Sequence, residues 1–143
     1  MANISQLAAR IRLVSSNVKL ETIRVTKEVA KEILETLVDN TPVDTSQALS
    51  NWQVSVGGPV SSMRAAFVVG SKGSTRSISA SATKVDGNQR VEAFTLGTPI
   101  HITNNLSYIQ GLNDGTISRQ PSGFVQKAML VGRNHLSTVK VSF

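Results

Sequence analysis

The side chains that could do acid–base or metal chemistry are two histidines and a set of glutamates. His101 and His135 are far apart, and neither has a histidine or carboxylate at the i,i+3 or i,i+4 spacing of a helical metal site. The glutamates alternate with lysines along one predicted helix face, which is typical of a solvated surface rather than a catalytic pair. They are Glu21, Glu28, Glu32 and Glu35. We therefore expect no metal, no cofactor and no catalytic dyad.

The sequence also lacks the common motifs for nucleophilic catalysis and phosphate binding. The chain has no cysteine, which excludes disulfides, thiol catalysis and zinc sites with sulfur ligands. It has no G-x-S-x-G elbow, Walker loop or G-x-G-x-x-G motif, and residues 70–74 resemble a phosphate loop only in composition. Asp44 and Asp114 stand in turn sequences, where aspartate usually hydrogen-bonds the backbone two residues further on, so we expect both to be structural. The sequence predicts a protein that is not an enzyme.

Positive charge is the remaining feature that could bind a partner. The 143 residues include 15 Lys or Arg and 9 Asp or Glu, for a net charge of +6. Residues 57–143 hold nine of the basic and three of the acidic side chains, so the whole excess lies there. Four of these cations, Lys72, Arg76, Lys84 and Arg90, lie in the polar stretch of residues 70–90. A stretch of this length is functional, mobile or partly helical around residues 77–85, and we favour a mobile arm that orders against phosphates or an acidic protein surface.

Apolar spacing predicts the helices that position these residues. Steps of three and four run over residues 4–18 and 20–37, with a bend or break at residues 15–17. Asn40 and Thr41 before Pro42 end this helix, because proline disfavours helical backbone in the residue before it. A second helix is predicted from Ser122 onward, near whose end His135 lies.

Alternating apolar residues predict the strands. The expected strands cover residues 52–56 and 99–103, with His101 facing solvent, and residues 65–69 form a further candidate. Residues 138–143 are expected to form a short strand or a tail. Only 4% of the residues are aromatic, and we place Trp52 and Phe124 in the core.

These elements predict one α+β domain over residues 1–143. A long N-terminal helix and a C-terminal helix pack on a small, mostly antiparallel sheet, and the polar arm spans about residues 70–90. Residues 1–10 lack the apolar segment of a signal peptide, and the longest apolar run, residues 65–69, is far below the roughly 20 residues that span a bilayer. We expect neither export nor membrane insertion.

Three segments together resemble one protein family. Residues 40–54, NTPVDTSQALSNWQV, resemble the T-P-V-D-T-G…S/N-W segment of small neck or tail-completion proteins of long-tailed bacteriophages, with Ser46 where the family usually has Gly. Residues 100–115, IHITNNLSYIQGLNDG, resemble its strand, N-N turn, Y-I and L-N-x-G pattern, and residues 120–125, QPSGFV, resemble the entry to its C-terminal helix. The matching residues are Thr41, Pro42, Val43, Asp44, Thr45, Trp52, Asn104, Asn105, Tyr108, Leu112, Asn113, Gly115, Pro121, Gly123 and Phe124.

This resemblance implies a structural protein of the virion neck or tail, made in the host cytoplasm and without enzymatic activity. It implies a homo-oligomeric ring, sixfold by the usual symmetry of phage tails, that completes or terminates the tail tube or joins it to the head connector. The tail tube protein and the connector proteins would be its partners, and genomic DNA in the channel a further contact. The alternative hypothesis, from the net charge of +6, is a basic nucleic-acid-binding protein.

Overall fold

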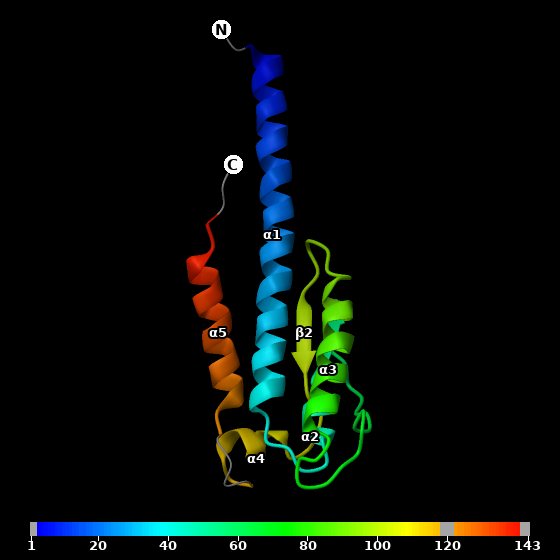
Figure 1. The fold of residues 1–143 in the computed structure, drawn as a ribbon. Coiled ribbons are helices and arrows are strands. Elements are labelled where there is room, and N and C mark those ends of the chain that lie inside the picture. Colours follow the sequence, from blue (N-terminus) through cyan, green and yellow to red (C-terminus); the bar gives the residue numbers. More distant parts are fainter. Residues whose placement is uncertain (1–2, 118–121, 141–143) are drawn as a thin grey trace.

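Helix α1 (Ile4–Asn40) runs along most of the molecule, and the other elements gather around its C-terminal half (Figure 1). The computed structural model describes residues 3–117 and 122–140. A capping box starts α1: the Asn3 side chain accepts from the Gln6 backbone N–H at 2.9 Å, and the Gln6 side chain accepts from the Asn3 N–H. The helix ends before Pro42, which confirms the predicted end.

The predicted break at residues 15–17 is wrong, because α1 is continuous through Ser15, Ser16 and Asn17. Each of these residues costs only about 0.5 kcal/mol of helix propensity relative to Ala, and neither Gly nor Pro is present to interrupt the hydrogen-bond ladder.

Short elements follow α1 and confirm the α+β class. They are α2 (Gln47–Ser50), β1 (Gln53–Val56), α3 (Arg76–Val91), β2 (Ile100–Thr103), α4 (Ile109–Asp114) and α5 (Phe124–Thr138). Strands β1 and β2 form an antiparallel pair with Val54 opposite Ile102. Both lie within the ranges predicted from alternation.

The candidate strand at residues 65–69 is wrong, because that segment is irregular. Side chains take its backbone hydrogen bonds: Phe67 N–H donates to Ser50 Oγ at 3.2 Å and Val68 N–H to Ser79 Oγ at 3.1 Å. A neighbouring strand is therefore not needed to satisfy these groups.

Helix α3 replaces most of the predicted mobile arm, and it includes residues 77–85, for which a helix was the alternative. Residues 76–91 pack against α1 and β1, and the buried positions Ser79, Thr83, Gly87 and Val91 recur every fourth residue. Small side chains let the helices approach closely: a Cβ on Gly87 would lie 2.3 Å from Leu34 Cδ2 and 3.1 Å from Val54 Cγ2. The arm prediction fails because this packing face is made of Ser, Thr and Gly, which a search for large apolar residues does not detect.

The core lies between α1, α2, α3, the strand pair and α5. Trp52 and Phe124 are 5% and 2% exposed, and their rings meet edge to face with centroids 6.1 Å apart, which confirms the prediction that both are core residues. Helix α5 packs along α1 and begins at Phe124, two residues after the predicted start, because Gly123 caps it with a left-handed backbone. The predicted strand or tail at residues 138–143 lies largely outside the described residues.

Arg64 fixes the irregular segment between β1 and α3. Its guanidinium donates to the carbonyl oxygens of Ser50 and Trp52 and, at 2.9 Å, to the carboxylate of Asp86 on α3. The Arg64 backbone N–H and C=O also pair with the Asn51 side chain, each at 2.8 Å. One side chain thus links α2, β1 and α3.

The close approach of α3 predicts a steric effect. Replacing Gly87 by Ala gains about 1 kcal/mol of helix propensity but forces a methyl group against the fully buried Leu34. We expect Gly87→Ala to lower the free energy of unfolding by about 1–3 kcal/mol, measured by urea denaturation. Gly58→Ala is the matched control, because a Cβ there meets nothing within 4 Å. Equal stability of the two variants would contradict this packing.

The Arg64–Asp86 contact predicts acid sensitivity. Burial opposes ionisation of Asp86, but hydrogen bonds from Arg64 and Arg90 outweigh it and hold the pKa of the carboxyl below its ordinary value. The resulting stabilisation is complete above the unfolded pKa of about 3.9 and is lost as the pH falls through the folded value. Unfolding measured at several pH values should therefore show a smaller loss below about pH 4 for Asp86→Asn than for the unmodified chain. An equal loss of unfolding free energy below pH 4 in Asp86→Asn and in the unmodified chain would show that Asp86 is not the group responsible.

Candidate functional site

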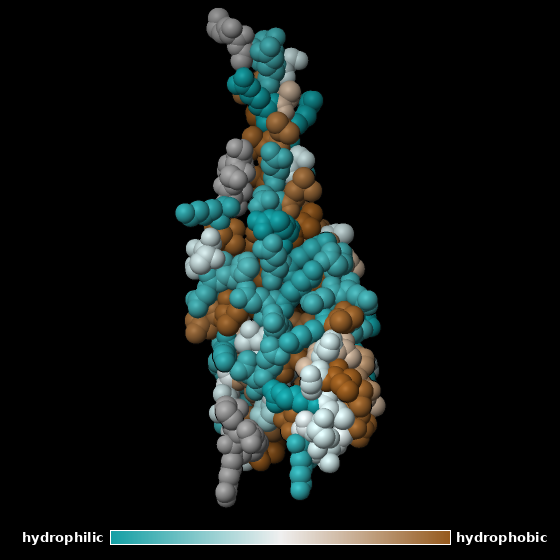
Figure 2. All heavy atoms as spheres, in the orientation of Figure 1, coloured by the Kyte–Doolittle hydropathy of each residue, from teal (hydrophilic) through white to brown (hydrophobic). Residues whose placement is uncertain are grey.

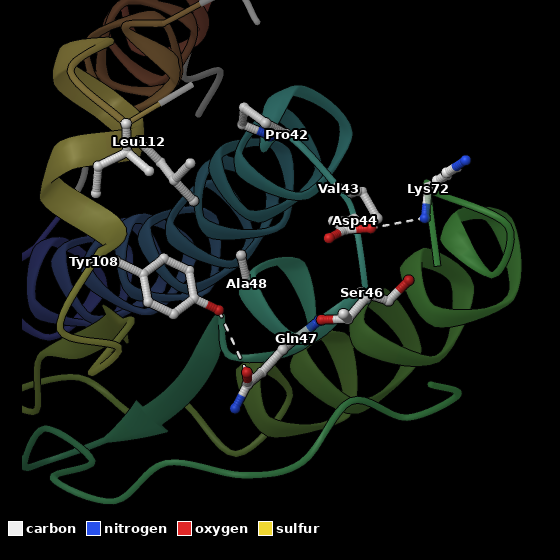
Figure 3. A pocket seen from close by; sticks show the side chains of 11 residues that line it. Pro42, Val43, Asp44, Ser46, Gln47, Ala48, Lys72, Tyr108 and Leu112 are labelled. Atoms are coloured by element: carbon white, nitrogen blue, oxygen red, sulfur yellow. Dashed lines mark hydrogen bonds between the residues drawn. The ribbon is translucent and has the colours of Figure 1, made fainter. Parts of the chain in front are cut away.

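A cleft of about 760 Å³ opens between the turn that follows α1 and the segment containing α4 (Figure 3). Its walls come from two of the segments that resemble phage neck proteins. Pro42, Val43, Asp44 and Thr45 lie on one side, and Tyr108 and Leu112 on the other. Folding thus brings together residues that are more than sixty positions apart.

The Thr41 hydroxyl forms the corner behind this cleft. It donates to the Leu37 carbonyl at 2.6 Å and accepts from Trp52 Nε1 at 2.8 Å, with both side chains buried. The hydroxyl therefore satisfies the indole N–H and one carbonyl at the end of α1. Thr41 and Trp52 tie the end of α1 to the start of β1.

Asp44 and Ser46 hold the loop before α3. The Asp44 carboxylate accepts from the Lys72 backbone N–H at 2.7 Å, and its carbonyl accepts from the Gly73 N–H at 2.9 Å. Asp44 does bond the backbone, but its partner is 28 residues away and not the predicted group two residues further on. Ser46 is buried at φ +70°, a left-handed conformation that favours Gly, and its hydroxyl lies 2.9 Å from Thr75 Oγ1. Thr45 Oγ1 accepts from the Gln47 N–H at 3.4 Å.

The second motif segment is fastened by its asparagines. Asn104 Nδ2 donates to the Ala48 carbonyl, and Asn105 Nδ2 to the Val60 carbonyl, each at 2.8 Å. Tyr108 points across the cleft and donates to Gln47 Oε1 at 3.4 Å (Figure 3). Partial burial raises the pKa of the Tyr108 phenol, so the hydroxyl is protonated at neutral pH.

The third set of motif residues joins α4 to α5. Asn113 Oδ1 accepts from the Val125 N–H at 2.9 Å, and the Asn113 carbonyl accepts from the Gly123 N–H at 2.7 Å. Gly115 and Gly123 have φ values of +79° and +80°, at which an L side chain would be strained. Pro121 lies outside the described residues. Leu112 is buried beside the cleft.

The titratable groups of the cleft are Asp44, Lys72 and Tyr108. Its carboxylate, Asp44, is engaged by a backbone N–H, and the cleft has no histidine to act as a base. No group of three or more His, Asp or Glu residues in the described part of the chain is arranged to hold a metal ion. The walls mix apolar side chains, a phenol and an exposed lysine, Lys72.

The four predicted arm cations do not form one basic surface. Lys84 lies 2.6 Å from the Asp39 carboxylate and Arg90 3.3 Å from Asp86. Arg76 donates to the Asp39 carbonyl at 2.5 Å, and the Lys72 side chain stands alone at the cleft. Arg76 and Lys84 therefore fasten α3 to the end of α1, and Arg90 pairs within α3 itself, which corrects the prediction of a mobile basic arm.

Unpaired cations lie instead on the first half of α1, where we did not expect them. Arg10, Arg12 and Lys19 form no ion pair within the described residues, and the first acidic residue of the chain is Glu21. The net charge of residues 1–56 is zero because the acidic residues from Glu21 onward balance the cations on this part of the chain. The net charge of residues 1–56 therefore does not reveal the cluster at residues 10–19.

The histidines lie apart. His135 on α5 contacts the carboxylates of Glu28 and Glu32 on α1, with Nε2 3.4 Å from Glu28 Oε2. These two glutamates therefore help to join α1 to α5 and are not purely solvated as we predicted. His101 lies half-buried on β2 opposite Ser55, which differs from the predicted solvent-facing position.

Large apolar side chains are exposed at several places on the described surface, and two of these places are the first half of α1 and the side of α3. Along the first half of α1, Ile4, Leu7, Ile11, Val14 and Val18 are 38–87% exposed. On and beside α3, Phe67, Ile78 and Val85 form a second group, which we call the α3 patch. Figure 2 shows apolar surface on the projecting helix and on the side of α3. No helix in the described part of the chain has the length and apolar character to cross a membrane.

Comparisons with family models, with curated proteins and with solved structures give no match to this chain. A proposal for its function therefore depends on the sequence resemblance and on the geometry of the site.

The Thr41–Trp52 bond predicts a thermodynamic coupling. Thr41→Val leaves the buried Trp52 N–H without an acceptor and should cost about 1–3 kcal/mol of unfolding free energy. Trp52→Phe removes that donor, so the double variant should be more stable than the two single losses added together. Thr41→Ser keeps the hydroxyl and is the control. Additive losses in the denaturation cycle would show that the bond does not couple the two residues.

Proposed function

We propose that this chain is a structural subunit of the head-to-tail neck of a long-tailed bacteriophage. Its role would be to form a ring that completes or terminates the tail tube or joins it to the head connector. The observation that carries this proposal is the convergence of the three motif segments. Residues 41–52 and 104–115 contribute walls of the cleft, and residues 123–125 are bonded to the second of these segments through Asn113.

The roles of the motif side chains support a structural rather than an enzymatic protein. Thr41, Asp44, Asn104 and Asn113 use their polar atoms on backbone groups or on the Trp52 indole. Such side chains fix the shape of loops and are not free to accept or donate protons in a reaction. A motif of this kind specifies a surface that a partner can recognise.

A ring needs two different contact surfaces on each subunit, because its interfaces are heterologous. The cleft beside α4 and the α3 patch are two such surfaces, formed by different elements. Three large apolar side chains of the α3 patch are 42–61% exposed, as expected for the centre of a protein interface. The tail tube and connector proteins are the partners proposed for the two faces of a sixfold ring in the virion.

A phage from which this gene has been deleted tests the role. Electron microscopy of the lysate should show heads and tails that are unjoined or tails of irregular length, and the unmodified chain should restore infectious particles. Ile78→Glu with Val85→Glu should fail to restore them, because two charges enter the α3 patch. Met63→Glu with Leu96→Glu, at exposed apolar residues outside the patch, should restore them. Infectious virions of normal appearance without the chain would refute the proposal.

A nucleic-acid-binding role is the second candidate, and Arg10, Arg12 and Lys19 are the observation that favours it. If these cations contact phosphates, DNA affinity should fall steeply with salt, by a slope of about 0.9 per contact on logarithmic axes. Replacing all three by Gln should then reduce that slope. Absence of DNA binding at low salt would remove this candidate.

A further inference from the structure

The first half of α1 carries an apolar stripe that the rest of the described chain does not cover. Ile4, Leu7, Ile11, Val14 and Val18 follow one another at alternating steps of three and four. Their exposed fractions range from 38% to 87%, and the first buried residue of α1 is Val25. Figure 1 shows these turns projecting beyond the body.

The spacing is that of a coiled-coil seam. Alternating steps of three and four average 3.5 residues, so the five side chains keep to one line along a slightly supercoiled helix. With Ile4 at heptad position a, residues 11 and 18 are also a positions, and residues 7 and 14 are d positions. A helix that extends beyond its own body gains stability chiefly by packing such a face.

We propose that this stripe packs against the same stripe of a second copy of the chain as a parallel two-stranded coiled coil. All three a positions, Ile4, Ile11 and Val18, are β-branched, and the two d positions are Leu7 and Val14. Within parallel coiled coils, β-branched residues at a with Leu at d, the combination that Leu7 completes, favour two strands over three or four.

The charges beside the seam favour the same arrangement. In a parallel pair, the g position Arg10 of one helix faces the e position Ser15 of the other, so no like charges meet. An antiparallel pair places g beside g. Because the stripe is centred on Ile11, the two Arg10 side chains would then lie close together and repel.

Lower on α1 the next a position, Val25, is buried in the body at 8% exposure. Val29, at the neighbouring e position, faces α5, where a Cβ on Gly132 would lie 3.6 Å from Val29 Cγ1. The seam stops at Glu21, a d position whose carboxylate pairs with Arg24 at 2.7 Å. This pairing does not depend on the proposed function, since it requires no phage component.

Cross-linking tests the pairing directly, because the chain has no cysteine of its own. In a parallel, in-register pair, residue 7 faces residue 7 and residue 14 faces residue 14, at a Cα separation that a disulfide can bridge. Leu7→Cys and Val14→Cys should therefore each form a covalent dimer under mild oxidation. Ser5→Cys, on the other side of the helix, should not. In an antiparallel pair, residue 7 can face residue 7 or residue 14 can face residue 14, but not both. Cross-linking of one variant alone, or of neither, would therefore overturn the proposal.

A charge substitution provides the second test. Leu7→Glu with Val14→Glu should weaken self-association at least tenfold in sedimentation velocity, because four carboxylates would meet in the seam. Leu13→Glu with Leu20→Glu is the matched control on the opposite side of the same helix and should leave self-association unchanged. All four side chains are exposed, so the thermal unfolding midpoint should stay constant in samples dilute enough for the unmodified chain to be monomeric. A monomeric unmodified chain at every concentration, or equal effects of the two double variants, would overturn the pairing.

Discussion

Helix α1 is longer than the body that packs against it. Its second half is the centre around which the body folds, and its first half projects from the body. Its 37 residues extend about 55 Å at 1.5 Å per residue, yet its buried residues begin at Val25. From there, α3, α5 and the short α2 surround the helix and exclude water from Leu34, Leu37 and Val38. One helix therefore provides both the centre of a hydrophobic core and a projecting apolar and basic surface.

The corner at the end of α1 connects this core to the candidate site. The Thr41 hydroxyl ends the helix and also satisfies the indole of Trp52, which packs on Phe124 at the start of α5. Most of the described motif residues build the loops around this corner, and the cleft is what those loops enclose. The same side chains therefore stabilise the fold and shape the surface that we propose meets other proteins.

Large side chains with a clear period made part of this structure predictable. The apolar spacing of α1, Pro42 after its end, the two strands and the burial of Trp52 and Phe124 follow from local rules. Helix α3 could not be predicted in this way, because Ser79, Thr83 and Gly87 pack through their small size. The role of Arg64 also depends on the fold, since its partners are two carbonyl oxygens and a carboxylate 22 residues away. The sequence shows the motif segments that line the cleft but not the cleft itself, because only the tertiary structure brings these segments together.

The central claim is that residues 25–40 of α1 belong to the folded core and that residues 4–20 pair with a second copy of the chain. Amide hydrogen exchange, measured residue by residue on dilute and concentrated samples, tests this claim most directly. The amides of residues 25–40 should exchange slowly at every concentration, because the core protects them. The amides of residues 4–20 should exchange rapidly in dilute solution and become protected as the concentration rises. Protection of residues 4–20 that equals that of residues 25–40 in dilute solution, or that never appears, would contradict this account.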